Sequence, residues 1–265
     1  MMPAFPQIQR RKIMPNTAAL PILLKELRLT AMGKQWQTLA QQAIDKDWTP
    51  EEYLAILCEE EVALRYQKRV LRYNQEAKLP PSKSLSSFDF SLIPAIKKSQ
   101  IEQKLKETHW VQKAENLLFF GPSGVGKTHL AAAMGYGLIE KGYRVRFFNT
   151  TALIQLLQKA REELSVLEAL TRLDKYSVLI LDDIGYVKKS EVETQVLFEL
   201  IAHRYESGSI ILTSNQPFSQ WDQIFDDNMM TVAAIDRIVH HATVIDCQGE
   251  SYRKQQALKK ENKVE

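Results

Sequence analysis

Cysteine is scarce in this chain, and long hydrophobic runs are absent. The two cysteines, Cys58 and Cys247, form neither a metal-ligand spacing nor a disulfide framework. No apolar run approaches the roughly 20 residues of a membrane-spanning helix. A short apolar run at 18–24 is interrupted by Pro21 and lacks a cleavage site, so we expect no signal peptide. These absences predict a cytoplasmic protein without a membrane partner.

Charge of either sign is also modest. The 265 residues carry a formal net charge of +3, which on its own is a weak indication of a nucleic-acid partner. Hydrophobic residues make up 45% and charged residues 25%, which is typical of a globular protein. The length allows one large domain or a small domain followed by a medium one.

Three of the ten glycines fall within a single short stretch. It reads Gly121-Pro122-Ser123-Gly124-Val125-Gly126-Lys127-Thr128, the phosphate-binding pattern G-x-x-x-x-G-K-T. An apolar run at 117–120 precedes it and a helical pattern at 129–140 follows. Glycines allow backbone N–H groups to curl around a phosphate chain, and the helix N-terminus adds further donors. A turn that matches the pattern by chance is the alternative, but the flanking strand and helix favour a nucleotide site.

The residue types in this stretch also predict the ligands. Lys127 would reach the β- and γ-phosphates of ATP, and the Thr128 hydroxyl would hold Mg²⁺. Farther along, an apolar run at 178–181 ends in Asp182-Asp183. We expect Asp182 to hold the same Mg²⁺ and Asp183 to act as the general base that activates water. A buried strand that simply ends in an acidic turn is the alternative.

Three further polar residues are candidates for catalysis. Asn215 follows an apolar strand pattern at 209–213, where it could orient water, although an asparagine before Pro217 is also typical of a turn. Arg204 and Arg237 could each neutralise charge on the γ-phosphate. A surface salt bridge is the alternative for either arginine.

The patterns along the chain predict an α/β fold preceded by a helical domain. Strand and helix patterns alternate after the phosphate loop, and the strands are fully apolar, which favours a parallel sheet covered by helices on both faces. Before it, Thr49 and Pro50 signal the start of a long helix. One apolar stripe is expected along it, formed by Leu54, Cys58, Val62, Tyr66, Val70 and Tyr73. The expected divisions are a flexible arm (1–16), a helical domain (17–79), a linker (80–91), the ATPase domain (92–253) and a basic tail (254–265).

Short basic strips are the candidates for contact with DNA. On the long helix, Arg65, Lys68, Arg69 and Arg72 recur at helical spacing. Lys97-Lys98 and Lys188-Lys189 form two smaller groups. Such strips are also common on solvated faces, so this interpretation competes with an ordinary charged surface.

The order of these motifs resembles the AAA+ ATPases, and within them the IstB-type helper ATPases of insertion-sequence transposition, which are relatives of the DnaC-type helicase loaders. The residues that carry the resemblance are Glu115-Asn116, the segment from Gly121 to Ala131 including His129, Leu181 to Tyr186, His203 to Glu206, Thr213-Ser214-Asn215, Asp236-Arg237-Ile238, Ser251-Tyr252-Arg253 and the stretch from Leu23 to Met32.

This resemblance implies an AAA+ parallel sheet sandwiched by helices, with Arg204 as an arginine finger on the adjacent subunit, Asn215 as the first sensor and Arg237 as the second. It further implies a homo-oligomer with ATP sites at its subunit interfaces, assembled on duplex DNA, with a transposase as partner. The sequence departs from the usual Asp-Glu pair at Asp182-Asp183, and it ends soon after Arg237. A helicase loader and a nucleotide-controlled interaction module with little turnover remain alternatives.

Overall fold

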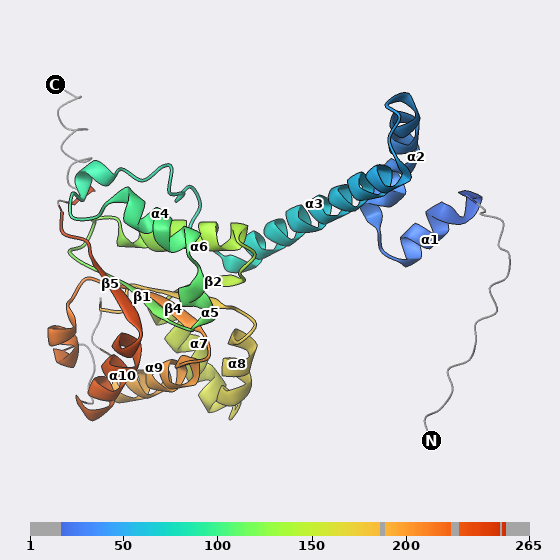
Figure 1. Cartoon of the computed structure of the whole chain (residues 1–265). Coiled ribbons are helices and arrows are strands. Elements are labelled where there is room, and N and C mark those ends of the chain that lie inside the picture. Colours follow the sequence, from blue (N-terminus) through green and yellow to red (C-terminus); the bar gives the residue numbers. More distant parts are fainter. Residues whose placement is uncertain (1–16, 186–188, 224–227, 250, 253–265) are drawn as a thin grey trace, which may run out of the picture. The chain divides into compact units, whose positions relative to one another are not determined.

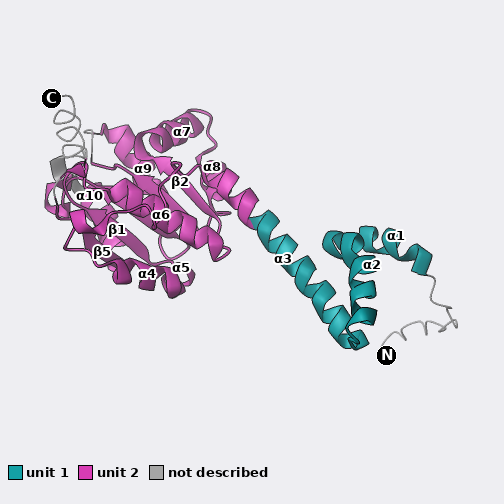
Figure 2. Ribbon diagram, turned by 90° about the horizontal axis from the view of Figure 1, so that it is seen from above, with its two compact units in different colours: residues 1–69 teal, residues 70–265 magenta. Residues whose placement is uncertain are grey.

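The computed structural model describes residues 17–185, 189–223, 228–249 and 251–252 (Figure 1). The chain divides into two compact units, residues 1–69 and 70–265 (Figure 2). The division falls within one helix, α3 (Pro50–Ala77), ahead of the linker expected from composition. The expected arm and basic tail lie outside the described residues. Among those described, no helix is both long and apolar enough to cross a membrane.

All elements in the described part of the first unit are helices, as predicted. It comprises η1 (Thr17–Ala19), α1 (Leu20–Glu26), α2 (Thr30–Asp45) and most of α3. The start of α3 at Pro50 follows from a reciprocal cap, in which Glu52 N donates to the Thr49 hydroxyl (3.2 Å) and Thr49 N donates to the Glu52 carboxylate (2.7 Å). The first four residues of the predicted apolar stripe, from Leu54 to Tyr66, are exposed, whereas Val70 and Tyr73 at its end are half-buried and pack against a core of the second unit.

The second unit contains a five-stranded parallel sheet in the order β2-β3-β4-β1-β5, which confirms the predicted sheet. The strands are β1 (Asn116–Phe120), β2 (Val145–Asn149), β3 (Val178–Asp182), β4 (Ser209–Ser214) and β5 (Ala242–Asp246). Every residue of β1, β3 and β4 is buried, as expected for central strands covered on both faces.

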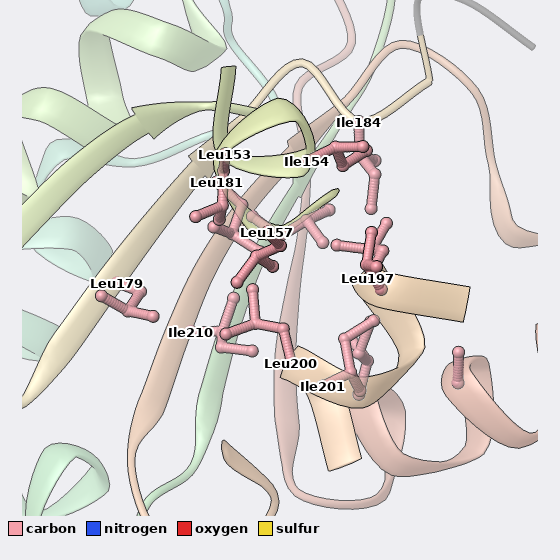
Figure 3. Packing of buried hydrophobic residues seen from close by; sticks show 14 of the residues in the cluster. Leu153, Ile154, Leu157, Leu179, Leu181, Ile184, Leu197, Leu200, Ile201 and Ile210 are labelled. Carbon is pink, nitrogen blue, oxygen red and sulfur yellow. The ribbon is translucent and has the colours of Figure 1, made fainter. Parts of the chain in front are cut away.

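Helices cover both faces of this sheet (Figure 1). One face packs against α4 (Lys98–Lys106), α5 (His109–Gln112) and α6 (Lys127–Glu140). The other packs against α7 (Thr150–Glu162), α8 (Val166–Leu173), α9 (Glu191–Arg204) and α10 (Asn228–His240). Figure 3 shows this second core, in which Leu157 of α7 and Leu200 of α9 pack near Leu181 and Ile210 of the strands. Two 3-10 helices, η2 (Phe90–Leu92) and η3 (Phe218–Gln223), complete the described elements.

Parallel pairing brings the carboxyl ends of β1, β3 and β4 to the same edge of the sheet. Phe120 at the end of β1 pairs with Ser214 at the end of β4, and Leu181 near the end of β3 pairs with Leu212. The glycine-rich stretch, the Asp182-Asp183 pair and Asn215 follow these three ends. The topology alone therefore collects motifs that are far apart in the sequence.

The segment expected to be a linker packs within the second unit. Leu85, Phe88 and Phe90 pack against the core that includes residues of α6, and Ile93, just after the segment, is fully buried in that core. This segment therefore lies beside the phosphate loop and helps to shape the site.

Candidate nucleotide-binding site

The loop between β1 and α6 has the backbone shape that its glycines predict. Gly121, Gly124 and Gly126 have φ values of 143°, 86° and 98°, which disfavour residues with a side chain. Space is also restricted, since a Cβ on Gly126 would come within 2.7 Å of the Phe88 ring and one on Gly121 within 2.3 Å of the Cys247 main-chain oxygen. The loop is thus a narrow backbone cradle of the kind that binds phosphate.

Lys127 begins α6 and is almost completely buried, with 7% of its surface exposed. Its Nζ donates hydrogen bonds to the main-chain oxygens of Gly121 and Pro122, both at 2.7 Å. The ammonium group therefore lies across the cradle. The N-terminus of α6 lies in the same region, so the ammonium charge and the positive end of the helix dipole converge there.

The two predicted metal ligands are brought together by the fold. The Thr128 hydroxyl donates to Oδ2 of Asp182 over 3.1 Å, although the residues are 54 positions apart. Oδ1 of Asp182 accepts from the Thr213 hydroxyl at 2.7 Å, and its main-chain oxygen accepts from the Thr150 hydroxyl at 2.8 Å. Burial raises the pKa of the Asp182 carboxyl, while the hydrogen bonds from Thr213 and Thr128 act in the opposite direction. A hydroxyl and a buried carboxylate beside a phosphate cradle are the oxygen donors that suit Mg²⁺.

Asp183 and Asn215 follow the ends of β3 and β4. Asp183 is half-buried, has a φ of 67° and donates its backbone N–H to the Thr213 hydroxyl at 2.8 Å. Asn215 is half-buried, and its Oδ1 is buried without a hydrogen-bond partner among the described residues. An unsatisfied buried oxygen at this edge of the sheet suits a position that meets an ordered water or a ligand.

A cavity of about 650 Å³ opens beside Asp183, a size typical of sites for small molecules, and Asn215 is not among its lining residues. One wall is the phosphate loop and the start of α6, and the opposite wall is the segment before η2. The lining residues are Pro81, Ser82, Lys83, Ser87, Phe88, Asp89, Leu92, Ser123, Gly124, Val125, Gly126, Lys127, Thr128, His129, Asp183, Thr213 and Tyr252. The cavity therefore extends from the acidic strand end, across the cradle, to an aromatic side chain.

His129 connects the two walls of the cavity. Its Nε2 lies 2.9 Å from the main-chain oxygen of Ser84 and 3.3 Å from the Ser87 hydroxyl, and its ring meets Phe88 edge-to-face. Burial lowers the pKa of the imidazole, with the nearby Lys83 adding to the effect. The structure thus places His129 at the cavity, in contact with the segment that covers the loop.

Comparison with known proteins agrees with this geometry. The family model described as IstB-like ATP binding protein matches residues 22–260. The chain belongs to this family. An insertion-sequence ATP-binding protein of Sinorhizobium fredii (y4iQ/y4nD/y4sD) is 47% identical over 243 residues, covering 92% of this chain and 82% of that protein. The corresponding protein of insertion sequence IS21 from Pseudomonas aeruginosa is 37% identical and covers 88% of each chain.

Solved structures identify the fold of this family member as AAA+, as predicted. The DnaC helicase loader matches with a TM-score of 0.55 and 23% identity, over 65% of this chain and 100% of that chain. DnaI matches with a TM-score of 0.54 and 25% identity, over 65% and 96% of the two chains. A DNA replication initiation factor also matches with a TM-score of 0.55 and 19% identity, and there the alignment spans 56% of the other chain.

Arg204 lies away from the cavity, and its environment contradicts the expected role as an arginine finger. Its side chain is 2% exposed, and it donates to the main-chain oxygens of Tyr176 (3.0 Å), Ser177 (3.1 Å) and Ser209 (3.3 Å). These residues lie at the amino-terminal ends of β3 and β4, the edge opposite the phosphate loop. Burial lowers the pKa of the guanidinium to about 10. A group held in this way is unavailable to a neighbouring subunit, so Arg204 is a structural cation.

Arg237 also lies outside the group of residues that line the cavity. Its Nη1 donates to the main-chain oxygen of Ala233 in the preceding turn of α10 (3.0 Å), and its guanidinium lies 5.2 Å from the ring centroid of Phe198 in α9. It is half-buried between these two helices. The expected role as second sensor would require Arg237 to leave these contacts.

The predicted DNA contacts differ in their accessibility. Arg65, Lys68, Arg69 and Arg72 are exposed on α3, and Lys97 and Lys98 are exposed at the start of α4. Arg65 already pairs with Glu61 (2.9 Å) and Lys98 with Glu102 (3.4 Å). Lys189 is 4% exposed, which contradicts its prediction as a DNA contact, because burial keeps its ammonium from a phosphate backbone. Lys188 lies outside the described residues.

Sequence reasoning missed the residues that complete the cavity. Phe88 and Ser87 were expected in a linker, and Tyr252 and Thr213 belonged to motifs without an assigned role. The Phe88-Asp89-Phe90 cluster was the available signal, because aromatic residues within a linker indicate that it packs on something. Tyr252 N donates to the main-chain oxygen of Gly124 (3.2 Å), a contact that only the fold reveals.

Proposed function

We propose that this protein binds and hydrolyses ATP and uses the cycle to assemble on duplex DNA and assist a transposase. The observation that carries the ATP assignment is the contact between Thr128 and Asp182, since it joins the phosphate cradle to the acidic strand end beside a ligand-sized cavity. The family and its insertion-sequence relatives support the biological setting.

Each group has a role in the proposed reaction. The cradle's N–H groups bind the β-phosphate, and Lys127 exchanges its main-chain partners for phosphate oxygens. Thr128 and Asp182 would hold Mg²⁺, which supplies positive charge to the phosphates during transfer. Asp183 accepts a proton from the attacking water, and Asn215 orients that water with its side-chain amide.

Two substitutions test this division of labour. Lys127→Ala removes a charge that contacts phosphate before the reaction, so ATP affinity should be lost. Asp183→Asn keeps the shape but removes the base, so ATP should bind while turnover falls by about 10²-fold or more. Binding of a fluorescent ATP analogue and release of phosphate should be measured for both. Wild-type turnover in Asp183→Asn would remove Asp183 from its catalytic role.

In this proposal, assembly on DNA depends on the basic charge of each subunit and on the number of subunits that bind together. A single subunit with a net charge of +3 should bind DNA weakly, whereas an ATP-bridged oligomer repeats its basic strips along the backbone. No base-reading motif is evident in the sequence, so contacts should be mostly electrostatic and weaken steeply with salt. Titrations on two unrelated duplexes, with and without an ATP analogue, test this. Tight binding to one duplex only, without nucleotide and insensitive to salt, would contradict it.

The transposase partnership needs its own experiment. The transposase of the same element should be retained by immobilised wild-type protein in the presence of DNA and ATP, and less so by Lys127→Ala. A replicative helicase tested in parallel distinguishes the helicase-loader alternative. Retention of the helicase but not the transposase would overturn the proposed role in transposition.

A further inference from the structure

Thr213 occupies the point where β3 and β4 separate at the candidate site. It is 1% exposed, and the last pair of residues in register between the two strands is Leu181 with Leu212. Beyond that pair, Thr213 makes the contacts that link the strands. The backbone path of β3 after its last paired residue therefore depends on the contacts that Thr213 makes.

The hydroxyl of Thr213 makes hydrogen bonds to both acidic residues. Thr213 Oγ1 donates to Oδ1 of Asp182 at 2.7 Å and accepts the backbone N–H of Asp183 at 2.8 Å. The main-chain oxygen of Thr213 in turn accepts from Ile184 N at 3.1 Å. Three consecutive residues are thus held by a single residue of the neighbouring strand.

These contacts have a specific consequence for each carboxylate. Oδ1 of Asp182 is bound by Thr213, so Oδ2 is the oxygen directed at Thr128. Asp183 has a φ of 67°, in the left-handed region that residues with a side chain adopt less readily than glycine. The hydrogen bond from its N–H to Thr213 favours that conformation, and the direction of the Asp183 side chain depends on it.

We propose that Thr213 is a positioning residue of the phosphoryl-transfer site, which aims the carboxylates of Asp182 and Asp183 through one shared hydroxyl. This inference rests on the proposed ATPase function. A purely structural threonine would matter for stability alone, whereas a positioning residue also changes the metal affinity and the rate.

The matched pair Thr213→Ala and Thr213→Ser isolates the hydroxyl, because both variants lose the same methyl group. Thr213→Val, which restores the bulk but not the hydroxyl, is a second variant without the oxygen. For each we would measure thermal stability, hydrogen exchange of the Asp183 amide, ADP affinity in the presence of EDTA, Mn²⁺ affinity with ADP by electron paramagnetic resonance, and kcat for ATP.

We expect Thr213→Ala to weaken Mn²⁺ binding and to lower kcat, each by about 10- to 100-fold, as for other partners of metal ligands. Its Asp183 amide should exchange faster, while metal-free ADP affinity stays close to wild type. Thr213→Ser should restore all three properties. If Thr213→Ala fails to fold, the comparison passes to Thr213→Val against Thr213→Ser.

Two outcomes overturn the inference separately from the proposed function. Wild-type Mn²⁺ affinity, kcat and Asp183 exchange in the hydroxyl-free variants would refute it while leaving the ATPase intact. Equal defects in Thr213→Ala and Thr213→Ser would also refute it, because the hydroxyl would not be responsible. If the wild-type protein itself binds neither ADP nor Mn²⁺ with ADP, the proposed function fails, and the role of Thr213 fails with it.

Discussion

Nη2 of Arg204 lies 3.3 Å from the main-chain oxygen of Ser209, the first residue of β4. Thr213, near the other end of the same strand, contacts Asp182. One strand therefore has a buried cation at its amino-terminal end and the candidate site at its carboxyl end. Gly208 permits this arrangement, since a Cβ there would come within 2.2 Å of the Arg204 guanidinium.

We predict that Arg204→Ala destabilises the protein by roughly 2–4 kcal/mol, because it leaves three carbonyl groups, two of them in buried hydrogen bonds, without their charged donor. Arg204→Lys should recover only part of this loss, since an ammonium cannot reproduce the planar fork of a guanidinium. Urea unfolding of dilute protein without nucleotide measures the effect. Loss of an arginine finger would lower only the turnover. An unchanged free energy of unfolding in Arg204→Ala would therefore contradict the structural role of Arg204 and favour the role of arginine finger.

Gly126→Ala should lower ATP affinity by about 10-fold or more, because its φ of 98° and the Phe88 ring 2.7 Å from the added Cβ would distort the cradle. Gly33→Ala is the matched control. Gly33 lies in α2, where the nearest atom to an added Cβ is 3.8 Å away, so this change should raise stability by up to about 1 kcal/mol. Unchanged ATP affinity in Gly126→Ala would show that the loop tolerates the side chain.

The sequence predicted the sheet and the phosphate loop because local signals determine both. Apolar strands alternate with helices, and a glycine-rich turn that leads into a helix permits few conformations. The sequence could not predict that Arg204 lies away from the site or that Thr213 contacts both acidic residues. Each position depends on which strand ends lie side by side. An arginine that ends a helix gives the same sequence pattern whether its guanidinium is in solvent or donates to main-chain carbonyl groups inside the protein.

The packing of residues 80–91 could not be predicted from the sequence for a different reason. Prolines and serines give this segment the composition of a linker, and composition reports average behaviour. Phe88 nevertheless contacts His129, and His129 contacts the Ser84 main chain. Although its composition is that of a linker, the segment is therefore held by tertiary contacts with α6 and lines the cavity.

His129 should make stability depend on pH. Because its pKa in the folded protein is below the ordinary value of 6.5, the unfolded chain binds more protons as pH falls through that value. The contribution of His129 to stability is therefore complete above about pH 7 and decreases as the pH falls towards 5. Urea unfolding from pH 5 to 8 should show a smaller pH dependence in His129→Gln, which cannot titrate. Parallel curves for the two proteins would contradict this interpretation.

The exposed cations of α3 allow a matched test of DNA binding. Neutralising two phosphate contacts should reduce the slope of log affinity against log salt by about 1.8, from the value of roughly 0.9 per contact for duplex DNA. We therefore predict this change for Arg69→Gln combined with Arg72→Gln, whose side chains are exposed on the predicted strip. The control is Lys159→Gln combined with Arg172→Gln, which removes the same charge from exposed residues of α7 and α8.

Both double variants change the net charge equally, so a general loss of attraction would weaken DNA binding in both. A direct contact would lower the slope only in the α3 variant, measured by fluorescence anisotropy with an ATP analogue at several salt concentrations. Equal slopes in the two variants would remove Arg69 and Arg72 from the DNA interface. In that case Lys97 and Lys98 become the next residues to neutralise, because they are exposed predicted contacts that lie at the start of α4 and not on α3.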